Sequence, residues 1–338
     1  MREPAFWWHE PGLASAMLAP FAGCYAAIAH SRMARDGARA GVPVVCIGNF
    51  TLGGSGKTPA VIAIAKLLQQ AGERVFCLSR GYGGKAGGPR QVNTQDRAEE
   101  VGDEALLLAH VAPTIVSRDR VAGARVAQAG GASVIIMDDG LQNGSIVKDL
   151  AIAVIDGRRG VGNGKVFPAG PLRAPLAAQW ARTDAVLVVG EVARAREVVA
   201  AAQARGKPVL HARIVADPAA ATALAGKQML AFAGIGDPEK FFDTLTAAGI
   251  GVARRAVFPD HHRFTAEEAA ALVMQAEHDG LELCTTEKDH ARMAGDAGLA
   301  ALSERAHVLP VALEFGNADE IKKLLTAALR RQPARASR

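Results

Sequence analysis

A glycine-rich segment that carries a lysine and a threonine is the strongest chemical signal in the sequence. It follows the apolar run Val42–Gly48, and the residues expected to bind phosphate are Thr51, Leu52, Gly53, Gly54, Ser55, Gly56, Lys57 and Thr58. Backbone N–H groups of such a loop point at phosphate oxygens, and the helix after it presents its positive N-terminus. Lys57 is expected to reach the β- and γ-phosphates, and the Thr58 hydroxyl to bind Mg²⁺. Thr51 stands where the usual form of this loop has a glycine, and a purely structural glycine-rich turn is the alternative.

Two adjacent carboxylates, Asp138 and Asp139, end the apolar run Ser133–Met137. A carboxylate at the end of a strand can hold Mg²⁺ directly or through water, so both are candidate metal ligands. Adjacent strand residues point to opposite faces, and the two acids are therefore not expected to do the same job. An acidic turn after a strand is the structural alternative.

Another acidic pair, Asp103 and Glu104, follows Gly102 at the start of a predicted helix. Aspartate is a favoured helix cap and acids suit the N-terminal end of the helix dipole, so spacing alone favours a capping role. The functional alternative makes one of the two a general base or a metal partner, with Glu104 a further candidate Mg²⁺ ligand.

The third constellation is Asp260-His261-His262, far along the chain. A zinc site would need further ligands, which the sequence does not supply at the right spacing. Two readings stay open from the residues alone. The segment is either a solvated loop or the source of a histidine that orients or tunes a catalytic carboxylate.

Composition sets limits on the class of protein. The 338 residues are 49% hydrophobic and 22% charged, which excludes a disordered chain, a collagen and a coiled coil. The net charge of +5 suits phosphate-bearing ligands or an anionic membrane surface. No dense Lys/Arg run with interleaved aromatic residues indicates nucleic acid as a partner. The four cysteines stand alone, without metal-ligand spacing, which favours a reduced chain facing the cytosol.

The N-terminal run Leu13–Ala29 contains no charged residue. Aromatic residues precede it and Arg32, Arg35 and Arg39 follow, a distribution that fits a helix lying on an anionic membrane surface. Pro20 is expected to interrupt the run. An ordinary helix packed on the domain, a membrane span and a signal sequence are the alternatives.

From Gly41 onward, apolar strand-like runs alternate with helical patterns, which predicts an α/β fold with a mostly parallel sheet covered by helices on both faces. The expected strands are Val42–Gly48, Arg74–Ser79, Thr114–Val116, Ser133–Met137, Leu150–Ile155 and Ala185–Val189, and the main expected helices are Thr58–Ala71, Asp103–His110 and Asp119–Gln128. A second, smaller α/β unit is expected to contain strands Met229–Ala233, Gly251–Phe258, Glu282–Thr285 and His307–Val311, with a helix over Glu239–Ala248.

These elements predict four parts of the chain. They are an N-terminal membrane-associated helix (1–40), a phosphate-binding domain (41–206), a connector (207–225) and a smaller C-terminal α/β domain (226–338). Within the connector, the apolar segment Lys207–Val215 is bounded by Pro208. The basic tail from Arg330 is expected to be frayed.

Taken together, the motifs resemble those of the tetraacyldisaccharide 4′-kinase family, the membrane-associated lipid A kinases. The segments that carry the resemblance occur in the family's order: Gly48–Pro59, Ser79–Gly83, Val101–Glu104, Asp138–Gln142, Phe167–Arg173, Phe258–His262 and Thr286–Asp289. Thr51 in place of glycine belongs to the family's own form of the loop.

The resemblance implies a kinase that transfers the γ-phosphate of ATP, with Mg²⁺, to the 4′-hydroxyl of a tetraacylated glucosamine disaccharide 1-phosphate, giving lipid IVA. It also implies work at the cytoplasmic face of the inner membrane, with a peripheral or monotopic attachment. The family's catalytic aspartate falls on Asp103 and its partner histidine on His261, with His262 the neighbouring possibility. In this scheme Asp103 accepts the hydroxyl proton and His261 orients the carboxylate, while Arg80, Arg158, Arg159 and Arg173 are candidates for the substrate phosphate.

Two other functions remain alternatives at this point. A membrane-attached P-loop ATPase switch predicts nucleotide-dependent attachment and no phosphorylated acceptor, but such switches carry a lysine where this chain has Leu52. A soluble kinase or ligase acting on a small metabolite leaves the apolar N-terminal run unexplained. The sequence carries no signal for an oligomeric state.

Overall fold

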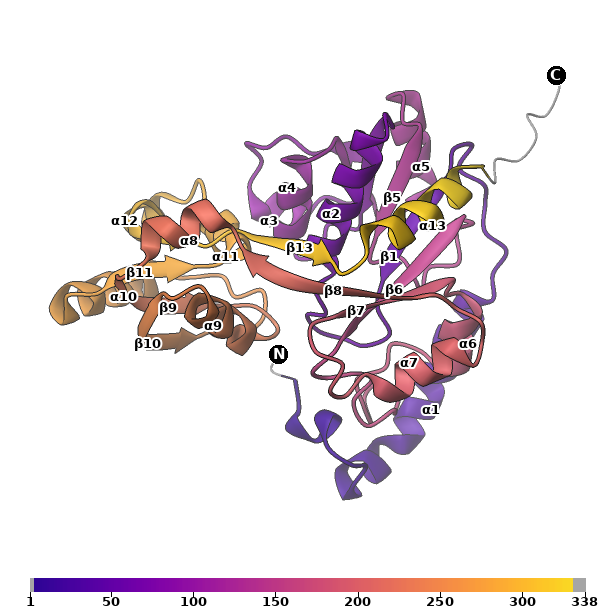
Figure 1. Ribbon diagram of the computed structural model, residues 1–338, viewed down its shortest axis with the longest axis horizontal. Coiled ribbons are helices and arrows are strands. Elements are labelled where there is room, and N and C mark those ends of the chain that lie inside the picture. The colour runs from indigo at the N-terminus through magenta and orange to yellow at the C-terminus, as the bar shows by residue number, and fades with distance from the viewer. Residues whose placement is uncertain (1–2, 331–338) are drawn as a thin grey trace.

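The computed structural model describes residues 3–330, which form two β-sheets (Figure 1). The strands of the large sheet are β1 (Val44–Gly48), β2 (Val75–Ser79), β3 (Arg90–Gln91), β4 (Thr114–Val116), β5 (Val134–Asp138), β6 (Leu150–Asp156), β7 (Ala185–Val189), β8 (Val209–Ala216) and β13 (Val311–Phe315). The strands of the small sheet are β9 (Gln228–Ala233), β10 (Gly251–Val257), β11 (Glu282–Thr285) and β12 (His307–Val308).

The large sheet has the strand order β13-β8-β7-β6-β1-β5-β2-β4-β3, and only its two outermost pairs, β13–β8 and β3–β4, are antiparallel. The small sheet has the order β10-β9-β11-β12, with all pairs parallel. The predicted mostly parallel α/β fold with a second, smaller sheet is confirmed. The expected strands from Val42 to Val189 end within about two residues of the observed ones, the usual uncertainty of an element boundary.

Helices cover both faces of each sheet, as near-continuous apolar strands require. The long or site-forming helices are α2 (Lys57–Gln70), α4 (Asp103–Ala109), α5 (Arg120–Ala129), α6 (Leu176–Ala181), α7 (Arg196–Gln203), α9 (Pro238–Ala247), α10 (Ala266–Asp279), α11 (Glu287–Met293) and α13 (Ala318–Arg330). The short ones are η1 (Ala5–Trp8), α3 (Ala98–Val101), α8 (Pro218–Leu224), η2 (Ala297–Leu299) and α12 (Ala300–Arg305). One core of the large sheet packs under α2, α4 and α13, and the other under α5, α6 and α7. In β1, Val45 and Ile47 point into the first core and Val44 and Cys46 into the second, the alternation expected of a strand.

The N-terminal helix α1 (Leu13–Met33) lies against the large unit at the opposite end from α13 (Figure 1). Pro20 does not interrupt it; the helix runs through this residue, which only lacks a backbone donor. Ser15 fixes the helix to the protein, because its Oγ donates to the Ala169 carbonyl at 2.9 Å and accepts from Asn163 Nδ2 at 3.0 Å. α1 is the one helix of the described chain that is long and apolar enough to cross a membrane.

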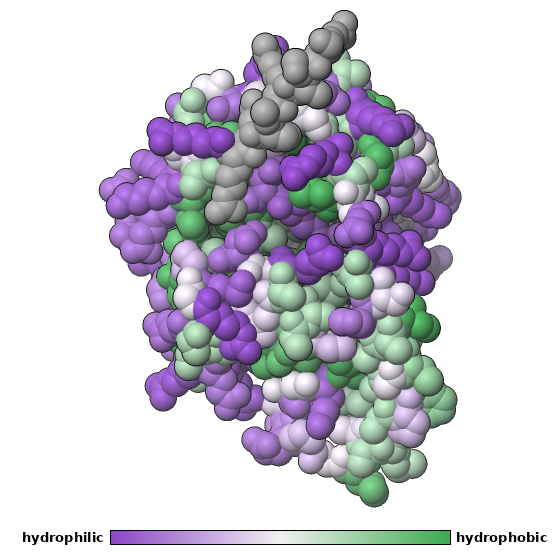
Figure 2. Space-filling view, turned by 90° about the vertical axis from the view of Figure 1, so that its right-hand side faces the viewer, coloured by the Kyte–Doolittle hydropathy of each residue, from purple (hydrophilic) through white to green (hydrophobic). Residues whose placement is uncertain are grey.

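Large apolar side chains of α1 remain exposed: Leu13, Met17, Phe21, Tyr25 and Ile28. Their spacing of four, four, four and three residues places them along one face of the helix. In Figure 2, hydrophobic side chains gather in the lower part of the face shown, the end of the molecule at which Figure 1 places α1. We call these five side chains the α1 apolar stripe.

The C-terminal half differs from the prediction in two places. The segment expected to be a connector forms β8, because Val209–Ala216 pairs with β7 on one side and β13 on the other. The single strand expected over His307–Val311 is split at Pro310 into β12 and β13, which belong to different sheets. The β8–β13 pair consequently runs between the two units (Figure 1). Most of the basic tail lies outside the described residues.

Candidate functional site

The glycine-rich segment joins β1 to α2, in the strand–loop–helix arrangement that its sequence predicts. Gly53 and Gly56 have φ angles of 93° and 87°, which favour residues without a Cβ. Helix α2 begins at Lys57, so the unpaired N–H groups of its first turn lie beside the loop. The Ser55 hydroxyl oxygen is buried there and has no hydrogen-bond partner among the described residues. Loop, helix start and hydroxyl together form a cradle for an anion.

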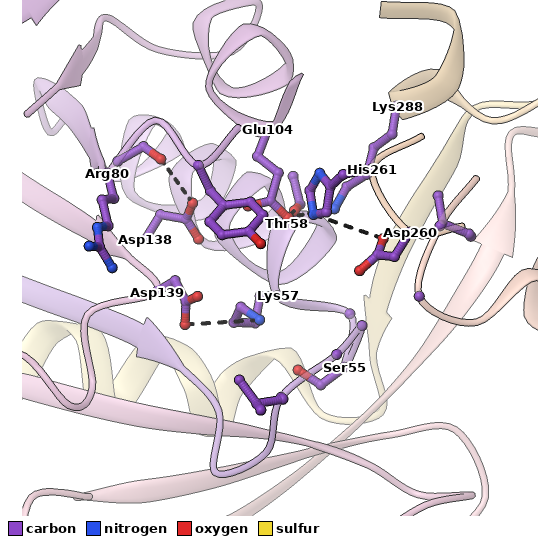
Figure 3. A pocket seen from close by; sticks show the side chains of 18 of the residues that line it. Ser55, Lys57, Thr58, Arg80, Glu104, Asp138, Asp139, Asp260, His261 and Lys288 are labelled. Carbon is purple, nitrogen blue, oxygen red and sulfur yellow. Dashed lines mark hydrogen bonds and ion pairs between the residues drawn. The ribbon is translucent and has the colours of Figure 1, made fainter. Parts of the chain in front are cut away.

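Lys57 and Asp139 lie side by side at the edge of this cradle (Figure 3), with Lys57 Nζ 3.9 Å from Asp139 Oδ1. Burial lowers the pKa of Lys57, and the negative charge of Asp139 opposes this effect. Arg173 holds Asp139 through both carboxylate oxygens, at 2.9 and 2.8 Å, and its Nε donates to the Thr51 carbonyl at 2.8 Å. Burial would raise the pKa of Asp139, but the charges of Arg173 and Lys57 keep it well below its usual range. Both carboxylate oxygens of Asp139 thus already contact positively charged side chains.

Asp138 differs from Asp139 in its contacts, as predicted, but the reason is not strand alternation: β5 ends at Asp138, and Asp139 follows it with a φ of 48°. Its Oδ2 accepts a hydrogen bond from Ser79 Oγ at 3.3 Å, while its buried Oδ1 has no partner among residues 3–330. Burial, followed by the negative charges of Glu104 and Asp139, raises the pKa of Asp138 to about 7. A buried carboxylate oxygen without a protein partner is suited to bind a cation.

Thr58 and Glu104 meet across the site, because Thr58 Oγ1 donates to Glu104 Oε1 at 3.2 Å. The same oxygen accepts from Lys288 Nζ at 2.6 Å, from α11 of the second unit. Burial would raise the pKa of Glu104, but the charge of Lys288 lowers it. Four predicted Mg²⁺ ligands therefore come together in space: Thr58, Glu104, Asp138 and Asp139.

The protein oxygens at this site are too few to hold Mg²⁺ by themselves, but they fit a Mg²⁺ ion that is also bound by nucleotide phosphates. No group of three or more His, Cys, Asp or Glu side chains within residues 3–330 has the geometry to hold a metal. Mg²⁺ at phosphoryl-transfer sites is commonly bound by one or two protein oxygens together with substrate phosphates and water. Thr58 Oγ1 and the unpartnered Asp138 Oδ1 suit that role, whereas Asp139 is already held by Arg173 and Lys57.

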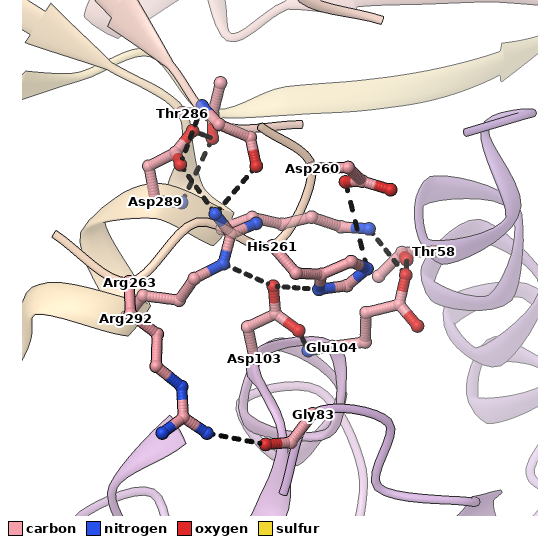
Figure 4. A network of polar contacts seen from close by, with 12 residues as sticks. Thr58, Gly83, Asp103, Glu104, Asp260, His261, Arg263, Thr286, Asp289 and Arg292 are labelled. Carbon is pink, nitrogen blue, oxygen red and sulfur yellow. Dashed lines mark hydrogen bonds and ion pairs between the residues drawn. The ribbon is translucent and has the colours of Figure 1, made fainter. Parts of the chain in front are cut away.

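Asp103 and His261 form a pair that spans the two units (Figure 4), with His261 Nδ1 3.3 Å from Asp103 Oδ2. Asp103 is only 3% exposed, and its Oδ1 accepts from the Glu104 backbone N–H at 2.9 Å. The capping role that spacing favoured is wrong, because Gly102 is the N-cap of α4 and Asp103 is the first helical residue, where its charge suits the helix dipole. Burial would raise the pKa of Asp103, but the hydrogen bond with His261 and the charge of Arg292 hold it well below its usual range. Burial lowers the pKa of His261, yet Asp103 raises it overall above its ordinary value.

His261 is also held in an uncommon backbone conformation, with a φ of 55°. Non-glycine residues in this region are strained and cluster at functional sites. Its ring packs edge-on against Tyr82 at 4.9 Å, and its Nε2 lies 3.8 Å from Asp260 Oδ1. His262 points elsewhere: its Nε2 lies 2.8 Å from Glu268 and its ring stacks on Phe258. Of the two histidines, His261 is therefore the one beside Asp103.

The phosphate loop, the strand-end carboxylates and His261 line one cleft of about 760 Å³ between the two units (Figure 3), and Asp103 lies buried beside it. Its residues from the large unit include the phosphate loop, Asp138 and Arg80, and those from the small unit include Asp260, His261 and Lys288. The lining includes apolar residues in or near β7, β8, β13 and α9: Val189, Ile214, Phe241, Leu309 and Val311. It also includes α1 and several arginines: Arg32, Arg35, Arg80 and Arg118.

Three of the four arginines considered for a substrate phosphate are already paired. Arg158 contacts Asp243 at 2.7 Å, Arg159 contacts Glu3 at 2.7 Å, and Arg173 holds Asp139. Only Arg80 of that set lines the cleft with no acidic partner among the described residues.

Sequence reasoning assigned no role to several residues that contact the predicted ones: Ser79, Asp260, Lys288 and Arg292. The acid–base alternation in Thr286-Glu287-Lys288-Asp289 was a signal for Lys288. Arg292 had no local signal, since its partner Asp103 lies 189 residues away.

A phosphate loop after the first strand of a parallel sheet, with a strand-end carboxylate beside it, defines a P-loop nucleotide-binding protein. A second unit that adds a histidine to the same cleft, paired with an aspartate of the first unit, defines a two-unit P-loop kinase as its class. The family model for tetraacyldisaccharide-1-P 4′-kinase, LpxK, matches residues 14–330. The chain belongs to this family.

Individual relatives agree over nearly the whole length. The chain is 51% identical to a tetraacyldisaccharide 4′-kinase of Bradyrhizobium sp. (strain BTAi1 / ATCC BAA-1182), with 98% of each chain covered. It is 54% identical to that of Methylobacterium sp. (strain 4-46), with 92% of this chain and 94% of the relative covered. Its fold matches the crystal structure of LpxK from Aquifex aeolicus in complex with ATP, with a TM-score of 0.72, 27% identity, and coverage of 94% and 100%.

Proposed function

We propose that the protein transfers the γ-phosphate of ATP to the 4′-hydroxyl of a tetraacylated glucosamine disaccharide 1-phosphate, at the surface of a membrane. Family membership supplies the class of reaction. The observation that carries the mechanism is the Asp103–His261 pair, in which His261 lines the same cleft as the phosphate loop and is held from behind its ring by the buried Asp103.

The phosphate end of ATP fits the cradle of Gly53–Thr58. Backbone N–H groups of the loop and Lys57 neutralise charge on the transferring phosphoryl group, which is the main task of the protein in this chemistry. Arg173 and Asp139 position Lys57, because the carboxylate is held by the arginine and lies beside the ammonium group. Thr58 and Asp138 would hold Mg²⁺, which would supply further charge neutralisation.

His261 is the better acceptor for the hydroxyl proton. Both oxygens of Asp103 are already engaged, with Arg292 and His261 on Oδ2 and the Glu104 N–H on Oδ1. A carboxylate whose pKa is held so low accepts a proton poorly near neutral pH. His261, 25% exposed and in the cleft, can donate from Nδ1 to Asp103 and accept the proton at Nε2. This assignment exchanges the roles that the sequence-based expectation gave to the two residues.

The phosphate loop lies on the large unit, whereas His261 and Lys288 lie on the small unit. Catalysis therefore depends on contact between the two units. Lys288–Glu104 and His261–Asp103 both cross the cleft. Water is poorly placed to replace the acceptor when the cleft is filled by substrate, which limits hydrolysis of ATP.

The acceptor is expected to approach the cleft from the side of α1. This helix lines the cleft through Tyr25, Ile28 and Arg32, so the α1 apolar stripe lies near the site where acyl chains would arrive. We propose that α1 lies on the cytoplasmic surface of the inner membrane. An apolar face flanked by arginines is typical of such helices.

The direct test is phosphate transfer from γ-labelled ATP to tetraacyldisaccharide 1-phosphate in detergent micelles. Label in a lipid with one added phosphate is expected, and its absence alongside released inorganic phosphate would instead support a membrane-attached ATPase. The His261→Gln variant should lose transfer while still binding ATP, because the phosphate loop does not contain this residue.

A further inference from the structure

A buried arginine stands behind the Asp103–His261 pair (Figure 4). Arg292 is 7% exposed, and its Nε donates to Asp103 Oδ2 at 2.7 Å. Its Nη1 donates to the Gly234 carbonyl at 2.8 Å and to Asp289 Oδ1 at 2.7 Å. One guanidinium thus contacts the carboxylate of the large unit and the backbone of the small unit at the same time.

We propose that Arg292 is a positioning residue for phosphoryl transfer, which fixes the Asp103 carboxylate and the His261 backbone relative to each other. The proposal rests on the proposed function. The link to His261 is the Gly234 carbonyl, which accepts from Arg292 Nη1 and also from the His261 backbone N–H at 3.0 Å. A strained residue such as His261, with a φ of 55°, keeps its conformation only when its surroundings hold it.

Asp289 in turn fixes the position of Arg292. Asp289 is fully buried, and its Oδ1 accepts from the Gly234 N–H at 3.0 Å while its Oδ2 accepts from Thr286 Oγ1 at 2.6 Å. A guanidinium presents donors in fixed directions within one plane, which suits two acceptors on different elements. A lysine ammonium on a flexible stem cannot replace this arrangement.

The test measures kcat and KM of Arg292→Ala separately. If Arg292 orients the pair, kcat falls by about 100-fold, since small misplacements of reacting groups cost this much. KM for ATP stays near the wild-type value, because the phosphate loop is untouched. Added guanidinium, at millimolar concentration, restores part of kcat, whereas neutral urea does not. Arg292→Lys recovers only part of the activity.

Removal of a buried cation leaves carboxylates uncompensated and can prevent folding. The double variant Arg292→Ala/Asp289→Asn removes one of these charges and keeps the experiment informative, with the same expected loss of kcat. Arg97→Ala is the matched control: Arg97 and Asp296 form an exposed ion pair across the same two units, so this variant should keep the wild-type kcat.

Arg292→Ala or the double variant with kcat within about threefold of wild type overturns the proposal. Equal rescue by urea and guanidinium, or an equal loss in Arg97→Ala, overturns it too, because either result assigns the effect to packing or to contact between the units. Failure of the wild-type protein to label the lipid would speak against the proposed function itself and is read separately.

Discussion

Replacing Asp103 with asparagine tests which member of the pair receives the proton. Asp103→Asn removes a negative charge 3.3 Å from His261 Nδ1 and keeps the size of the side chain. A hydrogen bond to a charged partner contributes about 1.5–3 kcal/mol, and 1.36 kcal/mol corresponds to about one pKa unit. The pKa of His261 in the variant is therefore expected to fall by about 1–2 units.

The assay is kcat/KM for the lipid acceptor from about pH 5 to about pH 9, with ATP and Mg²⁺ saturating at every pH. In the wild type the rate rises with pH as His261 loses its proton, with a midpoint above the ordinary histidine value because Asp103 raises the pKa. In Asp103→Asn the midpoint moves to lower pH. The plateau drops by about 10²–10⁴-fold, the usual contribution of general acid–base catalysis.

His262→Gln is the control, since this side chain contacts Glu268 rather than Asp103 and should leave the midpoint unchanged. A wild-type profile that is flat over this range would refute the reasoning. It would make Asp103 the proton acceptor, because its low pKa keeps it ionised throughout this range. Equal midpoints in the wild type and Asp103→Asn would also refute it.

Three further outcomes follow from the site and from α1. Lys57→Ala should lower kcat/KM by about 10²–10³-fold with little change in melting temperature, and near-normal transfer would remove Lys57 from the phosphate site. Because Asp138 has a raised pKa of about 7, it is protonated below that pH and must lose the proton to bind a cation. The apparent Mg²⁺ affinity of the nucleotide complex, titrated by activity, should thus be about tenfold weaker at about pH 6 than at about pH 8, and equal affinities would contradict the assignment. Met17→Glu should weaken binding to anionic vesicles by about 10–100-fold, whereas Met274→Glu should not; the two methionines are similarly exposed, at 69% and 62%, but only Met17 lies in the α1 apolar stripe. Equal effects of the two substitutions would show that α1 has no special part in attachment.

Local sequence predicted the central strands and the phosphate loop well. In β1, β5, β6 and β7 every residue is buried, so these strands read as continuous apolar runs. The loop is equally local, because its glycines, Lys57 and Thr58 follow one another without interruption. Such features depend on neighbours in the chain and need no knowledge of distant contacts.

The parts that sequence reasoning missed depend on long-range pairing. β8 is only partly buried and pairs with β13, about one hundred residues later, so its pattern resembled a connector. Asp103 combines a local feature that the sequence shows with long-range contacts that it does not show. Its place in the first turn of α4 is visible in the sequence, whereas its contacts with His261 and Arg292 exist only once the two units meet.

The central claim is that this site phosphorylates a lipid hydroxyl. The most direct measurement follows γ-labelled ATP with tetraacyldisaccharide 1-phosphate in micelles, comparing the wild type with His261→Gln. The account predicts labelled lipid from the wild type and almost none from the variant, with ATP binding retained in both. Phosphate released to water without labelled lipid, or equal transfer by both proteins, would contradict it.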